Sequence, residues 1–196
     1  MQEIKCLEWR PFSGSTLAVA SKYGICLWTI KTSKKLLEVK DTDIRVFTSG
    51  GGQESWMTLL SHPGQQNVVS LSWSPCGSYL AAICDGSNSL FVWEISTQKC
   101  TSFVRLDGPI LGLKWSPNGE KLAIAVPSYF RIWNTLTWTS SHVSCNGLIS
   151  SFEWMPDSQN NKLWRLIMFR AFKDQISPEI TLIYEFKDHS KFDLGR

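Results

Sequence analysis

The chain has 196 residues, of which 43% are hydrophobic and 19% charged, and this composition is typical of a globular protein rather than a disordered one. Its net charge of +3 is weak and its only adjacent basic pair is Lys34–Lys35, so the charge pattern does not favour binding to nucleic acid or to a membrane surface. No stretch approaches the roughly 18 apolar residues of a membrane span, and we expect neither membrane insertion nor a signal peptide.

A short motif built around tryptophan recurs four times along the chain. Each copy has an apolar residue, a spacer, Trp, a further residue and Pro, and the copies are Leu7–Pro11, Leu71–Pro75, Leu113–Pro117 and Phe152–Pro156. Successive copies begin 64, 42 and 39 residues apart. A second Trp follows the first three copies, at Trp28, Trp93 and Trp133. A period of about 40–45 residues with Trp at a strand end is the signature of WD-type propeller blades.

The first repeat predicts strands at Leu17–Ala20 and Ile25–Ile30, after its motif. The segment that follows, from Lys31 to Ser61, is longer than one outer strand needs. It contains Gly50–Gly52, which indicates a flexible loop. We expect the outer strand at Trp56–Leu60, so that the insertion explains the long first interval.

The second and third repeats follow one template. Apolar residues alternate with polar ones in Val69–Trp73 and Leu111–Trp115, as in half-buried strands. Pro and Gly then predict turns at Ser74–Gly77 and Ser116–Gly119. The template predicts second strands at Tyr79–Cys84 and Lys121–Val126, third strands at Ser89–Trp93 and Tyr129–Trp133, and outer strands near Thr101–Leu106 and Trp138–Val143. Both second strands contain Ala, which suits close packing between blades.

The fourth repeat is degraded, with predicted strands at Trp164–Phe169 and Glu179–Phe186 and a polar loop at Arg170–Pro178. The sequence as a whole predicts an all-β fold, a single partial WD-repeat β-propeller over residues 1–196 with about three blades and part of a fourth. The predicted blades are approximately 5–60, 65–106, 109–144 and 149–186, and the charged tail 187–196 is expected to fray.

Three stretches of the chain resemble the Aladin family of WD-repeat nuclear pore proteins: Leu17–Thr29, Leu60–Trp73 and Leu113–Trp133. The Leu-Ser-His-Pro-Gly run at residues 60–64 and the Trp-Thr ending at residues 28–29, in place of Trp-Asp, are more specific than generic WD motifs. The resemblance covers roughly residues 5–157. It implies a seven-bladed propeller in the full family member, anchored at the nuclear pore by partner proteins, above all a membrane-anchored one.

His62 stands where WD repeats place a Gly-His pair before a strand. We expect a structural role, with the ring bonded to a nearby turn or strand-end group. Asp85 is the candidate partner of this ring in a tetrad-like network. It lies eight residues before Trp93, however, where typical repeats use six, so the network is expected to be incomplete.

The sequence predicts no catalytic, cofactor or metal site. His142 and Cys145 are near in sequence, but no third group orients them as a nucleophilic pair, and His189 lies in the tail. Three scattered His and no C-x-x-C pair give no metal-ligand spacing, and Gly50–Gly52 lacks the Lys-Ser or Lys-Thr of a phosphate loop. We expect the six cysteines to be reduced thiols in a nuclear or cytosolic protein.

Most of the ten Trp fall at repeat positions that point inward, which favours core packing over stacking on nucleic acid. Trp56, Trp138 and Trp164 lie off this register. Any of the three that is exposed becomes a candidate anchor for a partner. Because three and a half blades cannot close a ring, we also expect apolar strand residues at the two open ends to face water or a foreign surface; these are Leu7, Val19 and Ile167.

These patterns favour a non-enzymatic scaffold that resembles a nuclear pore component and supports nucleocytoplasmic transport at the nuclear envelope by binding other pore proteins. The alternative is a generic WD-repeat adaptor in a ubiquitin-ligase or signalling complex. An enzyme carried on a propeller is a third and weaker hypothesis, because it needs a cleft with convergent polar groups that the sequence does not indicate.

Overall fold

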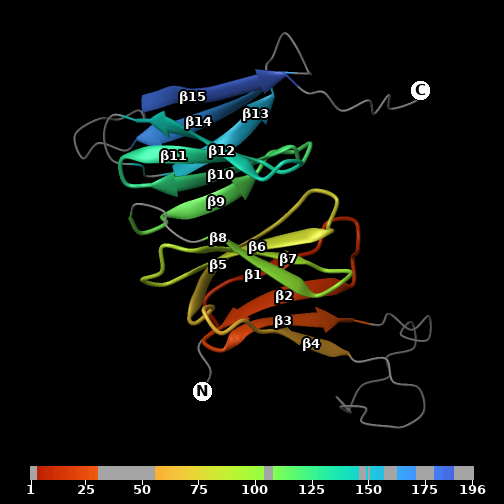
Figure 1. The fold of residues 1–196 in the computed structure, drawn as a ribbon. Helices are drawn as coiled ribbons and strands as arrows, with labels where there is room; N and C mark the ends of the chain where they lie inside the picture. The colour runs from red at the N-terminus through yellow and green to blue at the C-terminus, as the bar shows by residue number, and fades with distance from the viewer. Residues whose placement is uncertain are drawn as a thin grey trace, which may run out of the picture.

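The computed structural model describes residues 4–30, 56–103, 108–145, 149, 151–156, 163–170 and 179–187. The described residues form fifteen β-strands and no helix, which confirms the all-β prediction. The strands make four antiparallel sheets that follow one another from the N-terminal to the C-terminal end of the chain (Figure 1). The predicted loop at Gly50–Gly52, residues 171–178 of the predicted loop Arg170–Pro178 and nearly all of the predicted tail lie outside the described residues, whereas Arg170 itself is the last residue of a strand.

Each sheet joins its strands in chain order, as in a WD blade. Blade 1 consists of β1 (Leu7–Trp9), β2 (Thr16–Ser21), β3 (Gly24–Thr29) and β4 (Met57–Leu60). Blade 2 consists of β5 (Val68–Trp73), β6 (Tyr79–Cys84), β7 (Leu90–Glu94) and β8 (Lys99–Phe103). Blade 3 consists of β9 (Gly112–Trp115), β10 (Lys121–Val126), β11 (Tyr129–Asn134) and β12 (Thr139–Ser144). Blade 4 has three strands, β13 (Ser151–Pro156), β14 (Leu163–Arg170) and β15 (Glu179–Lys187).

A buried serine closes the turn between the first two strands of blades 2 and 3. The hydroxyl of Ser74 accepts a hydrogen bond from the Tyr79 backbone N–H, and Ser116 accepts one from Lys121, both at 2.9 Å. The turn glycine, Gly119 in blade 3, has a φ of +78°, a conformation that L side chains rarely adopt. The Ser-Pro-x-Gly sequence therefore fixes where each second strand begins.

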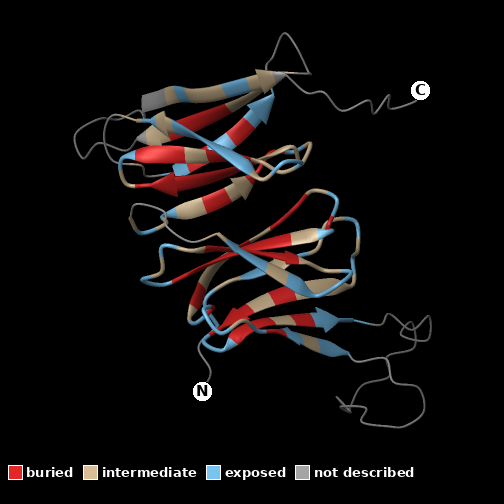
Figure 2. Cartoon of the chain, in the orientation of Figure 1, coloured by how far each residue is buried: buried red, intermediate tan, exposed pale blue. Residues whose placement is uncertain are grey.

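The two faces of a blade differ in composition. The face of a blade that is directed toward the preceding blade is called its leading face, and it carries the Leu or Phe and the Trp of the motif. The opposite face, called the trailing face, carries small residues of the second strand. Ala18 and Ala20 of β2 thus share a core with Leu71 and Trp73 of β5. The same pairing recurs between blades 2 and 3 and between blades 3 and 4. Small side chains let the sheets approach closely. Figure 2 shows the buried residues concentrated in the second and third strands of the blades, whereas the outer strands β8 and β12 are largely exposed.

A tryptophan hydrogen bond joins each pair of neighbouring blades. The indole Nε1–H donates to the backbone carbonyl of the residue that precedes the motif Trp of the blade before. The three bonds run from Trp73 to Glu8 (3.1 Å), from Trp115 to Ser72 (3.0 Å) and from Trp154 to Lys114 (3.1 Å). Trp73 and Trp115 are buried, as predicted.

The open ends of the stack differ from each other. Leu7 in blade 1 is 58% exposed, as predicted, and Val19 is half-buried. The prediction that Ile167 faces water is wrong: this residue of β14, which pairs with Glu153 of β13 and Leu182 of β15, is buried. Blade 4 instead carries an exposed ion pair, in which Arg165 Nε lies 3.1 Å from Glu185 Oε2.

Candidate protein-binding face of blade 1

The strand register of blade 1 gathers eight apolar side chains on its leading face. Directly opposed residues of antiparallel strands lie on the same side of a sheet. The first row across the four strands is Leu7, Val19, Cys26 and Leu59, and the second row is Trp9, Leu17, Trp28 and Met57. These eight residues are called the blade 1 face below.

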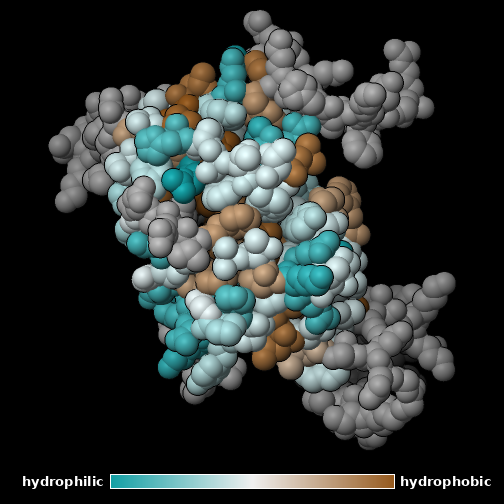
Figure 3. Space-filling model, viewed as in Figure 1, coloured by the Kyte–Doolittle hydropathy of each residue, from teal (hydrophilic) through white to brown (hydrophobic). Residues whose placement is uncertain are grey.

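The blade 1 face is open to solvent within the part of the chain that the structure describes. Trp9 is 49% exposed and Leu59 52% exposed, and Trp28 and Met57 are exposed as well. The prediction that the repeat Trp residues point into a core is therefore wrong for Trp9 and Trp28, because no described blade precedes them. Figure 3 shows hydrophobic residues at the surface at the lower end of the molecule, where β1–β4 lie.

Trp56 extends the blade 1 face beyond the start of β4. Its ring meets that of Trp28 edge to face, with 4.8 Å between the ring centroids, and its side chain is 60% exposed. Of the three candidate anchors named from the sequence, Trp56 alone is exposed, and so it alone meets the condition for binding a partner.

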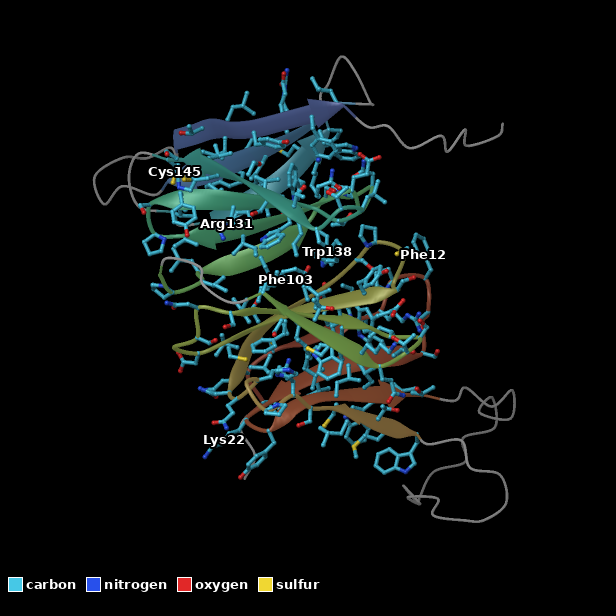
Figure 4. The ribbon with its side chains drawn as sticks, viewed as in Figure 1. Phe12, Lys22, Phe103, Arg131, Trp138 and Cys145 are labelled. Carbon is cyan, nitrogen blue, oxygen red and sulfur yellow. The ribbon has the colours of Figure 1, made fainter. Side chains whose placement is uncertain are left out.

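Trp138 and Trp164 pack against cores instead. Trp138 stacks on Phe103, with 5.1 Å between the centroids, and also lies edge-on to Tyr79 and Trp115. Figure 4 shows Trp138 and Phe103 side by side between blades 2 and 3. Trp164 is half-buried against the core between blades 3 and 4.

The blade 1 face is the counterpart of surfaces that the chain buries elsewhere. Leu7 corresponds to Leu71 and Leu113 in the motif, and those two residues are buried. By the same register, Trp9 corresponds to Trp73 and Trp115, and Trp28 to Trp93 and Trp133, all buried. The face therefore has the shape and chemistry to pack on a further sheet, and the Trp9 indole N–H can donate to a backbone carbonyl of that sheet.

The first strands of blades 1, 3 and 4 carry three charged side chains at the blade junctions: Glu8, Lys114 and Glu153. Glu8 accepts a hydrogen bond from the Trp73 backbone N–H at its Oε2 (3.1 Å), and burial raises the pKa of Glu8 to about 7. Lys114 forms an ion pair with Glu153. These residues line a cavity of about 400 Å³ together with Ser72, but no nucleophile and base are brought together there.

The other residues considered for chemistry have structural surroundings. His62 Nδ1 accepts a hydrogen bond from the Gly64 N–H (3.2 Å), as predicted for a turn-bonded ring. Its predicted partner Asp85 instead accepts a hydrogen bond from Asn67 Nδ2 (3.1 Å), and no bond joins His62 to Asp85 among the described residues. His142 lies against the Tyr129 ring, and Cys145 is half-buried. The described residues contain no cluster of three metal-ligating side chains and no helix long and apolar enough to cross a membrane.

Three of the cysteines are unreactive packing residues. Burial raises the pKa of Cys6, Cys84 and Cys100 to about 11, so these thiols stay protonated at neutral pH and are poor nucleophiles. All six cysteines are thiols rather than halves of disulfides.

Comparison with known proteins gives several WD-repeat relatives, and no protein-family model matches the chain. The chain is 34% identical to Aladin of Arabidopsis thaliana over 166 residues, which are 81% of this chain and 37% of Aladin. It is 26% identical to WD repeat and HMG-box DNA-binding protein 1 of Mus musculus over 75% of this chain and 12% of that protein. It is also 26% identical to THO complex subunit 3 of Arabidopsis thaliana over 62% of this chain and 38% of that protein. The chain thus spans well under half the length of these relatives.

Proposed function

Because the chain is Aladin-like and is built of WD-type blades, we propose that it is a non-enzymatic scaffold that holds other proteins of the nuclear pore through the blade 1 face. The observation that carries the proposal is the exposure of a face whose counterparts in blades 2 and 3 are buried between sheets. Burying an exposed apolar face of this kind is favourable by roughly 25 cal/mol for each Å² removed from water.

The occupant of the blade 1 face is a propeller blade of a partner protein, with small residues in its second strand. Each described blade junction pairs a face with a motif Leu or Phe and a Trp against a face that carries Ala18 and Ala20, Ala81, or Ala123 and Ala125. The same chain's blade 4 fits this pattern poorly, since Ile167 and Phe169 stand at the corresponding positions of β14. The preferred occupant therefore comes from outside the described blades. By analogy with the other junctions, it also presents a backbone carbonyl of its first strand to the Trp9 indole N–H.

The nuclear pore setting rests on the resemblance to Aladin. In this proposal the chain lies at the nuclear envelope, its partners include a membrane-anchored pore protein, and its contribution to nucleocytoplasmic transport is structural. The alternative proposal is a general WD-repeat adaptor, in a ubiquitin ligase or signalling complex, that would use the same face.

Proximity labelling with the tagged chain in cells tests the proposal. The test variant carries Leu7→Glu and Leu59→Glu, two exposed members of the first row. The control carries Phe12→Glu and Leu136→Glu, which are 98% and 82% exposed and lie in turns outside the face. We expect the parent and the control to label pore proteins at the nuclear rim, and the test variant to lose that labelling.

The outcomes separate the site from the setting. Equal labelling of pore proteins by the parent and the Leu7/Leu59 variant would rule out the blade 1 face. Labelling of ubiquitin-ligase or signalling components in place of pore proteins, abolished by the same variant, would support the adaptor instead. Equal melting temperatures of the two double variants show that neither result comes from unfolding.

A further inference from the structure

A pocket of about 320 Å³ lies between blades 1 and 2, away from the blade 1 face. One wall is the β2–β3 turn with Lys22 and Tyr23, and the other is the loop of residues 61–67 between β4 and β5. The Asn67 backbone N–H donates to the Lys22 carbonyl at 2.9 Å and holds the two walls together. Figure 4 shows Lys22 pointing away from the sheets at this turn, so its ammonium group is at the rim.

Gln65, which lines this pocket, has a fixed and unused hydrogen-bond donor. The side chain is 1% exposed, and its Oε1 accepts a hydrogen bond from Trp93 Nε1 at 3.2 Å. An indole N–H can only donate, so this bond fixes which end of the Gln65 amide is oxygen. The Nε2 group is left buried with no hydrogen-bond partner among the described residues. Buried polar groups are nearly always paired in native proteins, and an unpaired donor therefore indicates a missing acceptor.

Two further side chains that line the pocket, His62 and Lys22, can donate as well. Because His62 Nδ1 accepts the Gly64 N–H, the neutral ring carries its proton on Nε2. Lys22 adds a positive charge at the rim. None of the described residues that line the pocket is acidic, and the nearby Asp85 is bonded to Asn67 Nδ2. The pocket thus combines an amide donor, an imidazole donor and an ammonium group, without a competing anion in its lining.

We propose that this pocket binds the carboxylate of an acidic peptide segment from a partner protein. One carboxylate oxygen accepts from Gln65 Nε2, and the negative charge faces Lys22, an arrangement that charge-assisted hydrogen bonds favour. Tyr23, which is 62% exposed beside the pocket, packs on the aliphatic part of the peptide. The site is separate from the blade 1 face, so it stands or falls independently of the proposed function.

Two-dimensional NMR of the labelled chain with defined peptides tests this site. The probes are the blocked pentapeptide Ac-Ala-Ala-Glu-Ala-Ala-NH₂, the same peptide with Gln in place of Glu, and Ac-Ala-Ala-Ala-Ala-Ala with a free C-terminal carboxylate. The Gln65 side-chain amide signal, assigned by its loss in Gln65→Glu, reports on the pocket directly. We expect it to shift saturably with the Glu peptide and not with the Gln peptide. The third peptide shows whether a terminal carboxylate serves equally.

Variants at the rim and floor complete the test. Lys22→Met should weaken binding of the Glu peptide about three- to tenfold, whereas Lys99→Met, an exposed lysine on β8, should leave it unchanged. Gln65→Glu keeps the oxygen that faces Trp93 and replaces the donor, so its peptide binding should be lost while its melting temperature stays near that of the parent. Equal shifts with the Glu and Gln peptides, or equal binding by Lys22→Met and the parent, would overturn the proposal.

Discussion

The environment of a motif tryptophan depends on whether a blade lies in front of it. Trp73 and Trp115 are 3% and 7% exposed and donate to a carbonyl of the preceding blade, whereas Trp9, in the same motif, is 49% exposed. Sequence alone identifies all three as repeat positions. It cannot distinguish their burial, because burial is decided by a neighbouring sheet rather than by the residue's own strand.

Replacing Trp115 tests the junction between blades 2 and 3. We expect Trp115→Ala to lower the free energy of unfolding by about 3–5 kcal/mol, the range for a large core aromatic. Trp115→Phe should lose less packing than Trp115→Ala. In addition to that packing loss, it should cost about 1 kcal/mol, because it removes the hydrogen bond to Ser72. The matched variant Trp9→Ala should cost no more than about half as much as Trp115→Ala, since half of its surface is already in water. Urea unfolding of the three variants measures these differences, and equal costs at Trp9 and Trp115 would contradict the junction.

Glu8 gives stability a specific pH dependence. Burial raises its pKa from 4.5 to about 7, so the folded chain holds this proton more tightly than the unfolded chain. Its contribution to stability is therefore complete below about pH 4.5 and is lost as the pH rises through about 7. We expect Glu8→Gln to flatten the fall in the free energy of unfolding over this interval, measured by urea titrations at several pH values. Glu120→Gln removes a carboxyl outside the junction and should keep the parent's slope; a parent slope retained in Glu8→Gln would refute the assignment.

Gln65 shows which residues sequence reasoning misses. A glutamine in a loop, next to Gly64 and Gln66, has no pattern that distinguishes it from a solvated one. Its importance comes from Trp93, which is 28 residues away in the chain and takes up one end of its amide. The same holds for Trp138, whose contacts with Phe103 and Tyr79 join two blades.

At the scale of strands and turns, much of the fold follows from local sequence. The second strands of blades 2 and 3, Tyr79–Cys84 and Lys121–Val126, have the bounds that the sequence predicts. Period-two alternation and Ser-Pro-x-Gly turns carry enough information for this, since the serine hydroxyls fix the strand start. The irregular register of β14 and β15 between Leu166 and Ile167 has no such local signal, because it arises from the pairing between two strands that are eight residues apart in the chain, at 171–178.

The β2–β3 turn depends on a glycine in close contact with the neighbouring strand. Gly24 has a φ of +140°, and a Cβ at this position would lie 2.5 Å from the Leu60 carbonyl oxygen. We expect Gly24→Ala to destabilise the chain by about 3 kcal/mol or more, through strain and displacement of β4. Gly14→Ala is the control, because Gly14 also has positive φ but a Cβ added there would meet nothing within 4 Å, and it should cost about 1–2 kcal/mol. Thermal unfolding compares the two; a similar cost for both would show that β4 yields easily.

At the scale of the whole molecule, the open blade 1 face predicts association. Exposed apolar sheet faces drive contacts between chains. We expect the 22.2 kDa chain to elute as a concentration-dependent larger species in size-exclusion chromatography with light scattering, and the Leu7→Glu/Leu59→Glu variant to shift toward the monomer. The Phe12→Glu/Leu136→Glu control should behave like the parent. A parent that remains a monomer with a sharp melt at every concentration would show that the open face is tolerated in water.

The direction of the tryptophan bonds has a consequence for the order of folding during synthesis. Every donor indole belongs to a later blade, and every acceptor carbonyl to a blade that has already left the ribosome. Each strand also pairs only with its neighbours in the chain, so each step closes short loops. Nascent chains arrested after β8 and after β12 should therefore resist protease up to the last completed blade. Protection that arises only once β15 has emerged would show instead that the blades fold together.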